Sequence, residues 1–264
     1  MCYFGIGGGS DFFSASLFTR ESDVILTALA PLVSDDNAID LPSTIAKYMT
    51  RGFRIESEAF DDRVEPSTGC PILVDSRRRN AYGVIVPDRR FQTEFVECLR
   101  SLKQLLGEMD IRAIDTGGDC LRGRVKGMGD TDISFLYESV KDTRDENAIY
   151  LIRELTQRPI HITILGPGSD GETSEEGLKI GYQSLRVGES SSVHLVREGN
   201  IQDLVPNLTS QVGWCDPKRD STIGNILRGF EDRYRDRKVP IERRGVQLHE
   251  ISSQWLTRYW IVRV

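Results

Sequence analysis

This chain of 264 residues has few of the residues from which disulfide-rich and zinc-binding proteins are built. It contains 3 histidines and 5 cysteines, and the cysteines are scattered along the chain without a Cys-x-x-Cys pair. An odd, dispersed set of cysteines argues against a disulfide framework, and the shortage of histidine argues against a zinc site. The composition therefore favours a reducing, cytoplasmic setting.

Long hydrophobic runs and an excess of positive charge are also missing. No stretch approaches the roughly eighteen consecutive apolar residues of a membrane span, and no basic segment precedes the apolar residues at the N-terminus. The chain has 34 Lys and Arg against 40 Asp and Glu, a net charge of -6. Because an acidic protein has no overall attraction to nucleic acids or anionic membranes, we expect neither as a partner.

Alternating apolar runs and helical patterns are what the sequence does contain. Strands are expected at 2–7, 81–87, 111–115 and 160–166, and apolar residues recur at helical spacing over 91–109. Further elements are expected at 43–57 and 133–140. This alternation predicts a mostly parallel, Rossmann-like doubly wound α/β sheet with helices on both faces. The chain is interpreted as a single domain over 1–264, in which the tail 240–264 forms one or two final strands or an edge-strand extension.

Three glycine-rich loops carrying carboxylates follow predicted strands, and the first reads "GIGGGSD" at 5–11. Free backbone N–H groups between a strand and a helix suit an anion such as phosphate. The alternative is that Asp11 or Ser10 caps the helix while the glycines allow tight packing. The predicted phosphate-binding residues here are Gly7, Gly8, Gly9, Ser10 and Asp11.

The second loop, "DTGGD" at 115–119, places Asp115 and Asp119 around Gly117 and Gly118 where a strand should end. Carboxylates repel phosphate, so these two would hold ribose hydroxyls or Mg²⁺, or act as a catalytic nucleophile or base. The alternative is a turn in which Asp119 bonds its own backbone. The basic residues Arg122, Arg124 and Lys126 follow, either reaching a phosphate or lying in an exposed loop.

The third loop, "GPGSDGE" at 166–172, contributes Gly168 and Ser169 as predicted binding residues and Asp170 and Glu172 as predicted catalytic acids. Asp-Gly is also a common turn dipeptide, and Glu172 stands just before the next helix, so both have a structural alternative. In open parallel sheets, ligands bind beyond the carboxyl ends of the strands. We therefore expect the three loops to share one mouth.

The three motifs in this order resemble the family known as domain of unknown function 1152, found in archaea and bacteria. The resemblance is nearly end to end and includes the closing segment "IERRGVQLHEISSQWLTRYWIV". Two departures are visible: the chain begins directly at the first strand, and a basic "RGRVKGMGD" replaces the family's acidic glycine stretch. The family has no known activity, so the resemblance implies the fold and the place of the site. It maps the family's motif residues onto Gly7, Gly8, Gly9, Asp11, Asp115, Asp119, Gly166, Gly168, Asp170, Gly171 and Glu172.

The predicted function is a hydrolase or group transferase acting on a nucleotide-like or phosphorylated sugar substrate. Asp115 and Asp119 would bind ribose or Mg²⁺, and Asp170 or Glu172 would act as general acid or base. The alternative is a module that binds or sequesters a nucleotide without converting it. A dehydrogenase comes third, because the full Gly-x-Gly-x-x-Gly pattern is missing. Homo-oligomerisation is left open.

Overall fold

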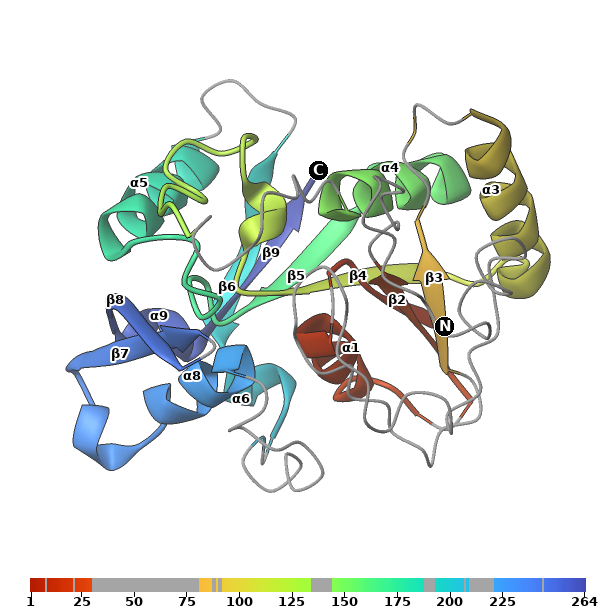
Figure 1. Cartoon of the computed structure of the whole chain (residues 1–264). Coiled ribbons are helices and arrows are strands. Elements are labelled where there is room, and N and C mark those ends of the chain that lie inside the picture. Colours follow the sequence, from red (N-terminus) through yellow and green to blue (C-terminus); the bar gives the residue numbers. More distant parts are fainter. Residues whose placement is uncertain are drawn as a thin grey trace. The chain divides into compact units, whose positions relative to one another are not determined.

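The computed structural model describes residues 1–7, 9–20, 22–29, 81–86, 89, 92–133, 144–187, 193–206, 208, 221–243 and 245–264. Two compact units divide the chain, one comprising Met1–Ile111 and Val140–Arg158 and the other Arg112–Ser139 and Pro159–Val264. Both units combine helices with strands (Figure 1), which confirms the mixed α/β class; the strands of the first unit are all parallel, whereas the second unit has parallel and antiparallel pairs. The element expected at 43–57 and, apart from Ile133, the element expected at 133–140 lie outside the described residues.

Three parallel strands form the sheet of the first unit, in the order β3 (Ala81–Ile85), β2 (Val24–Leu29) and β1 (Cys2–Gly5). The helix α1 (Gly9–Ser16) packs on β1 and β2, and α4 (Arg144–Thr156) packs on β2 (Figure 1). Burying large apolar side chains between helix and sheet is the main stabilising contribution. The largest of these side chains are Phe4, Ile6, Phe12, Phe13, Ile25, Leu26 and Ile149.

The helix α3 (Gln92–Leu106) confirms the strongest periodic pattern of the sequence. Its buried positions Phe95, Cys98, Leu102 and Leu106 recur every three or four residues and therefore share one face. The helix ends where Gly107 adopts a φ of 56° and donates its N–H to the Lys103 carbonyl at 2.9 Å. A glycine in this left-handed conformation is a common helix stop.

The sheet of the second unit has the order β4 (Ile111–Thr116), β5 (His161–Leu165), β9 (Arg258–Arg263) and β6 (His194–Asn200). β4 and β5 are parallel, whereas β9 runs antiparallel to both β5 and β6, so the sheet is mixed. The tail therefore supplies an interior strand and not the expected edge strand. Burial explains the position, since Trp260 and Val262 are fully buried and Tyr259 nearly so.

A β-hairpin of β7 (Lys238–Arg243) and β8 (Val246–Ser252) completes the second unit together with several helices. It packs against α8 (Ser221–Gly229) and α5 (Glu175–Val187). Tyr182 of α5 and Trp260 of β9 meet Trp255 with ring centroids 5.6 to 5.9 Å apart. The short helices are η2 (Asp119–Leu121), α6 (Ile201–Leu204), η5 (Asp232–Tyr234) and α9 (Ser253–Leu256). Among the described residues, no helix is long and apolar enough to cross a membrane.

Candidate functional site

The glycine loop of the first unit contacts the start of the helix that follows it, α1. The Gly7 N–H donates to the Asp11 carboxylate, and the Thr27 hydroxyl donates to the Gly7 carbonyl at 3.2 Å. A β-carbon on Gly5 would lie 2.8 Å from the backbone carbon of Asp11, so this glycine allows α1 to approach β1 closely. Asp11 is only 3% exposed. These contacts favour the capping interpretation of Asp11. Gly8 lies outside the described residues.

A second carboxylate of the first unit borders the same loop. Asp145, in the first turn of α4, has its Oδ1 3.5 Å from the place that a β-carbon on Gly7 would take. Asp145 was not predicted, because its local signal is limited to an acidic first helical turn. Two carboxylates beside Gly7 make this loop a poor environment for phosphate, because like charges repel.

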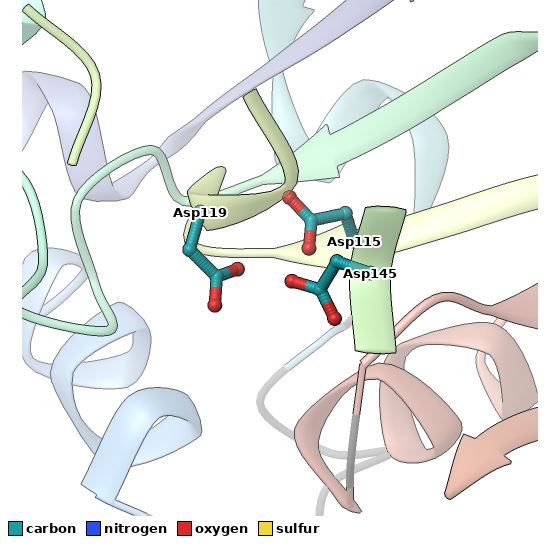
Figure 2. A group of neighbouring side chains, drawn as sticks. All are labelled: Asp115, Asp119 and Asp145. Carbon is teal, nitrogen blue, oxygen red and sulfur yellow. The ribbon is translucent and has the colours of Figure 1, made fainter. Parts of the chain in front are cut away.

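The second glycine loop, in the second unit, brings two carboxylates together. β4 ends at Thr116, and Gly117 and Gly118 take φ values of 109° and 97°, which reverse the chain into η2 and place Asp119 at its start. Oxygens of Asp115 and Asp119 lie within 4.8 Å of one another. Figure 2 shows the Asp115 carboxylate pointing toward that of Asp119; it also labels Asp145, which belongs to the first unit. The predicted acidic pair is therefore close in space.

The second and third loops lie side by side, as expected. The Gly168 N–H donates to the Gly117 carbonyl at 2.6 Å. A β-carbon on Gly117 would lie 2.5 Å from Asp170 Cγ, so the Asp170 carboxyl rests directly on this glycine. The Asp170 Oδ1 also accepts the Glu172 N–H at 2.8 Å, which is the Asx-turn alternative. The first loop belongs to the other unit, and its share in a common mouth stays a prediction.

Glu172 is held between two arginines. Arg243 of β7 is 7% exposed and donates to the Asp170 carbonyl at 2.7 Å and to Glu172 Oε1 at 3.2 Å. Arg122 pairs with Glu172 Oε2 at 3.3 Å. These bonds favour an anchoring role for Glu172, and its role as a general acid or base stays a prediction. Arg243 was missed because no local pattern reveals which arginine of a tail will be buried.

Packing accounts for the remaining predicted residues of the third loop. Ser169 is fully buried, and its carbonyl accepts from Asn225 Nδ2 at 2.8 Å. The same Asn225 amide bonds the Glu242 carbonyl at 2.9 Å, which ties the loop to the hairpin. A β-carbon on Gly168 would lie 2.8 Å from the side chains of Leu178 and Ile251. Gly168 and Ser169 are therefore enclosed by protein.

Accessibility separates Asp119 from the other predicted acids of the second unit. Asp115 is 0% exposed, and Asp170 and Glu172 are 4% and 8% exposed, whereas Asp119 is half-buried. The adjoining Cys120 is 2% exposed, which confirms the interpretation of this thiol as a small buried hydrophobic group. A ligand reaching this edge of the second unit would therefore meet Asp119 first.

The comparisons with known proteins identify no family for this chain. The resemblance to domain of unknown function 1152 accordingly stays a hypothesis that depends on the three loops. The chain matches no family model, no curated protein and no solved structure.

Proposed function

We propose that this protein is a hydrolase or group transferase that acts on a nucleotide-like or phosphorylated sugar substrate with the help of a divalent cation. The observation that carries the proposal is the pair of carboxylates at the end of β4, Asp115 and Asp119, with oxygens within 4.8 Å. Two carboxylates this close repel one another, and a divalent cation between them offsets that repulsion. Carboxylate oxygens are also the ligands that Mg²⁺ prefers.

The two carboxylates would have different roles. Asp115 is fully buried and fixed at the end of a strand, which suits a group that holds a cation in one place. Asp119 begins a short helix and retains exposed surface, which suits a group that contacts both cation and substrate. A cation bound here would polarise a phosphoryl oxygen of the substrate. Asp170, which packs against Gly117, would stabilise the turn between the two acids.

A binding module that senses or sequesters a nucleotide is the second candidate. It is favoured by the engagement of Asp170 in its turn and of Glu172 in two ion pairs, contacts that give both residues a structural role. A binder would use the same carboxylates for recognition alone. The two candidates differ in whether the ligand leaves the protein chemically changed.

The wider setting of the proposal follows from the sequence. We take the fold to be a Rossmann-like doubly wound sheet in a cytoplasmic protein whose partner is a small molecule and not a nucleic acid. A binding edge beyond the carboxyl ends of β4 and β5 is where such sheets receive ligands. Homo-oligomerisation is compatible with this proposal and is not required by it.

The first experiment measures Mn²⁺ binding, as a probe for Mg²⁺, by isothermal titration of the wild type, Asp119→Asn and Asp110→Asn. Asp110 is an exposed acid just before β4, so its variant is matched in charge and chemistry. We expect Asp119→Asn to lose at least about tenfold in affinity, equal to about 1.4 kcal/mol, and Asp110→Asn to bind like the wild type. Equal binding by all three proteins would refute the cation site.

Incubation with a panel of nucleotides, nucleotide sugars and sugar phosphates in the presence of Mg²⁺ then separates the two candidates. A new product in the mass spectrum that disappears in Asp119→Asn establishes an enzyme. A ligand that stays bound and unchanged through desalting establishes the binding module, and Asp119→Asn then loses affinity alone.

A further inference from the structure

Arg122 is an exposed cation next to Asp119 on the second glycine loop. Its backbone N–H closes η2 by donating to the Asp119 carbonyl at 2.9 Å. Its aliphatic stem lies across Gly129, where a β-carbon would come within 3.0 Å of Arg122 Cδ. Gly129 has a φ of 68°, a conformation that glycine adopts readily, and it leaves room for the stem. The backbone and the aliphatic stem of Arg122 are therefore held in place by the fold.

The segment that carries Gly129 is itself hydrogen-bonded to residues 172–174, just before α5. The Gly129 N–H donates to the Thr173 hydroxyl at 2.8 Å, and the Thr131 N–H donates to the Glu172 carbonyl at 3.0 Å. Asp130 accepts from the Ser174 N–H and hydroxyl at 2.9 and 2.7 Å. A loop held at several points keeps its side chains in place before a ligand arrives, which lowers the entropy lost on binding.

Two guanidiniums pair with Glu172, and that of Arg122 is the more exposed. Glu172 carries one negative charge, and the buried guanidinium of Arg243 already neutralises it at 3.2 Å. The second guanidinium, of Arg122, is 59% exposed and pairs with the same carboxylate at 3.3 Å. Exposed ion pairs contribute little to stability, so Arg122 can exchange this partner while Glu172 stays paired with Arg243. Arginine binds phosphate through charge-assisted, often bidentate hydrogen bonds.

We infer that Arg122 is the phosphate-binding residue of the second unit, and that it turns from Glu172 to the phosphate of a substrate whose cation is held by Asp115 and Asp119. The inference rests on the proposed function. It assigns the phosphate contact to Arg122 and not to the first glycine loop. In that loop the Gly7 N–H already serves the Asp11 carboxylate. A phosphate contact at Arg122 also limits the expected substrates to compounds with a phosphate or diphosphate group next to the bound cation.

The test is titration of inorganic pyrophosphate, in Mg²⁺ and at fixed ionic strength, into the wild type, Arg122→Met, Arg122→Lys and Lys126→Met. Lys126 is an exposed cation of the same loop, so its variant removes the same charge four residues away. We expect Arg122→Met to bind pyrophosphate about tenfold more weakly, Arg122→Lys to recover part of the loss, and Lys126→Met to stay within about twofold of the wild type. Mn²⁺ affinity in the absence of pyrophosphate should be unchanged in Arg122→Met, and its unfolding transition should match that of the wild type.

Two results would overturn the inference without touching the cation site. One is an equal loss in Arg122→Met and Lys126→Met, which would mean that only the general charge of the loop matters. The other is a wild type that binds Mn²⁺ but not pyrophosphate. Failure of the proposed function looks different, because Mn²⁺ would then bind Asp119→Asn as well as the wild type.

Discussion

Gly177→Ala should destabilise the protein, although alanine is the better helix former. Gly177 lies in the first turns of α5, and its replacement by alanine gains up to about 1 kcal/mol of helix propensity. The new methyl group would overlap the carbonyl oxygen of Gly127 and lie 2.6 Å from Asp130 Oδ1. Side-chain carbons essentially never come closer than 3.0 Å, so Asp130 must move by at least 0.4 Å and the Gly127 carbonyl by more.

The cost of that movement exceeds the gain in propensity. Overpacking against backbone costs about 1–3 kcal/mol. Displacing Asp130 also weakens its hydrogen bonds to Ser174, each of which contributes about 1 kcal/mol. We expect Gly177→Ala to lower the free energy of unfolding, measured by urea titration, by about 2 kcal/mol.

Gly181→Ala, in the same helix, is the matched control. Its methyl group would meet the Met128 side chain, with Sδ at 2.7 Å, and a flexible thioether can move aside. This variant should stay within about 1 kcal/mol of the wild type. A Gly177→Ala protein as stable as the wild type would show that the loop that carries Arg122, Gly127 and Asp130 moves away from α5 without a cost in stability.

Two further predictions concern titratable groups. Burial raises the pKa of the Cys2 and Cys98 thiols to about 12, so iodoacetamide at about pH 8 should label both only in urea, as read by peptide mass spectrometry; fast labelling of the folded protein would contradict this burial. Burial lowers the pKa of His249 below its ordinary 6.5, against smaller opposing effects of a hydrogen bond to the Thr173 backbone and the charge of Asp130. The unfolded chain then takes up the proton first, so stability present above pH 6.5 is lost as the pH falls below it. His249→Gln should flatten urea midpoints measured between about pH 7 and pH 5, and an unchanged slope would exclude His249 as its source.

Four strands, β1, β3, β4 and β5, and the helix α3 could be predicted from local pattern. The signals for these elements are local: apolar residues recur at helical spacing in α3, and glycines follow β1, β4 and β5. The structure places these elements where they were expected. The start of α5 shows the limit of such reasoning. Thr173 and Glu176 have the spacing of a capping box, yet Ser174 is the residue that accepts the Gly177 N–H, at 3.1 Å.

The candidate site was predictable where it depends on strand ends and unpredictable where it depends on distant pairing. Asp115 lies at the end of β4, and Asp119 and Asp170 lie in the loops that follow the neighbouring parallel strands β4 and β5; topology alone brings such strand ends together. Arg243 and Asn225 reach the third loop from 73 and 56 residues away. No sequence period encodes contacts of that separation, because they depend on how the hairpin and α8 pack.

The interior position of β9 also constrains the order in which the chain can fold during synthesis. β5 and β6 are made long before residues 258–263, and the sheet of the second unit cannot join them until that strand has left the ribosome. Until then the pairing edge of β5 stays open, and exposed strand edges invite wrong pairing. We therefore expect nascent chains stalled before residue 258 to need a chaperone to stay soluble, whereas chains that include residues 258–263 should fold unaided.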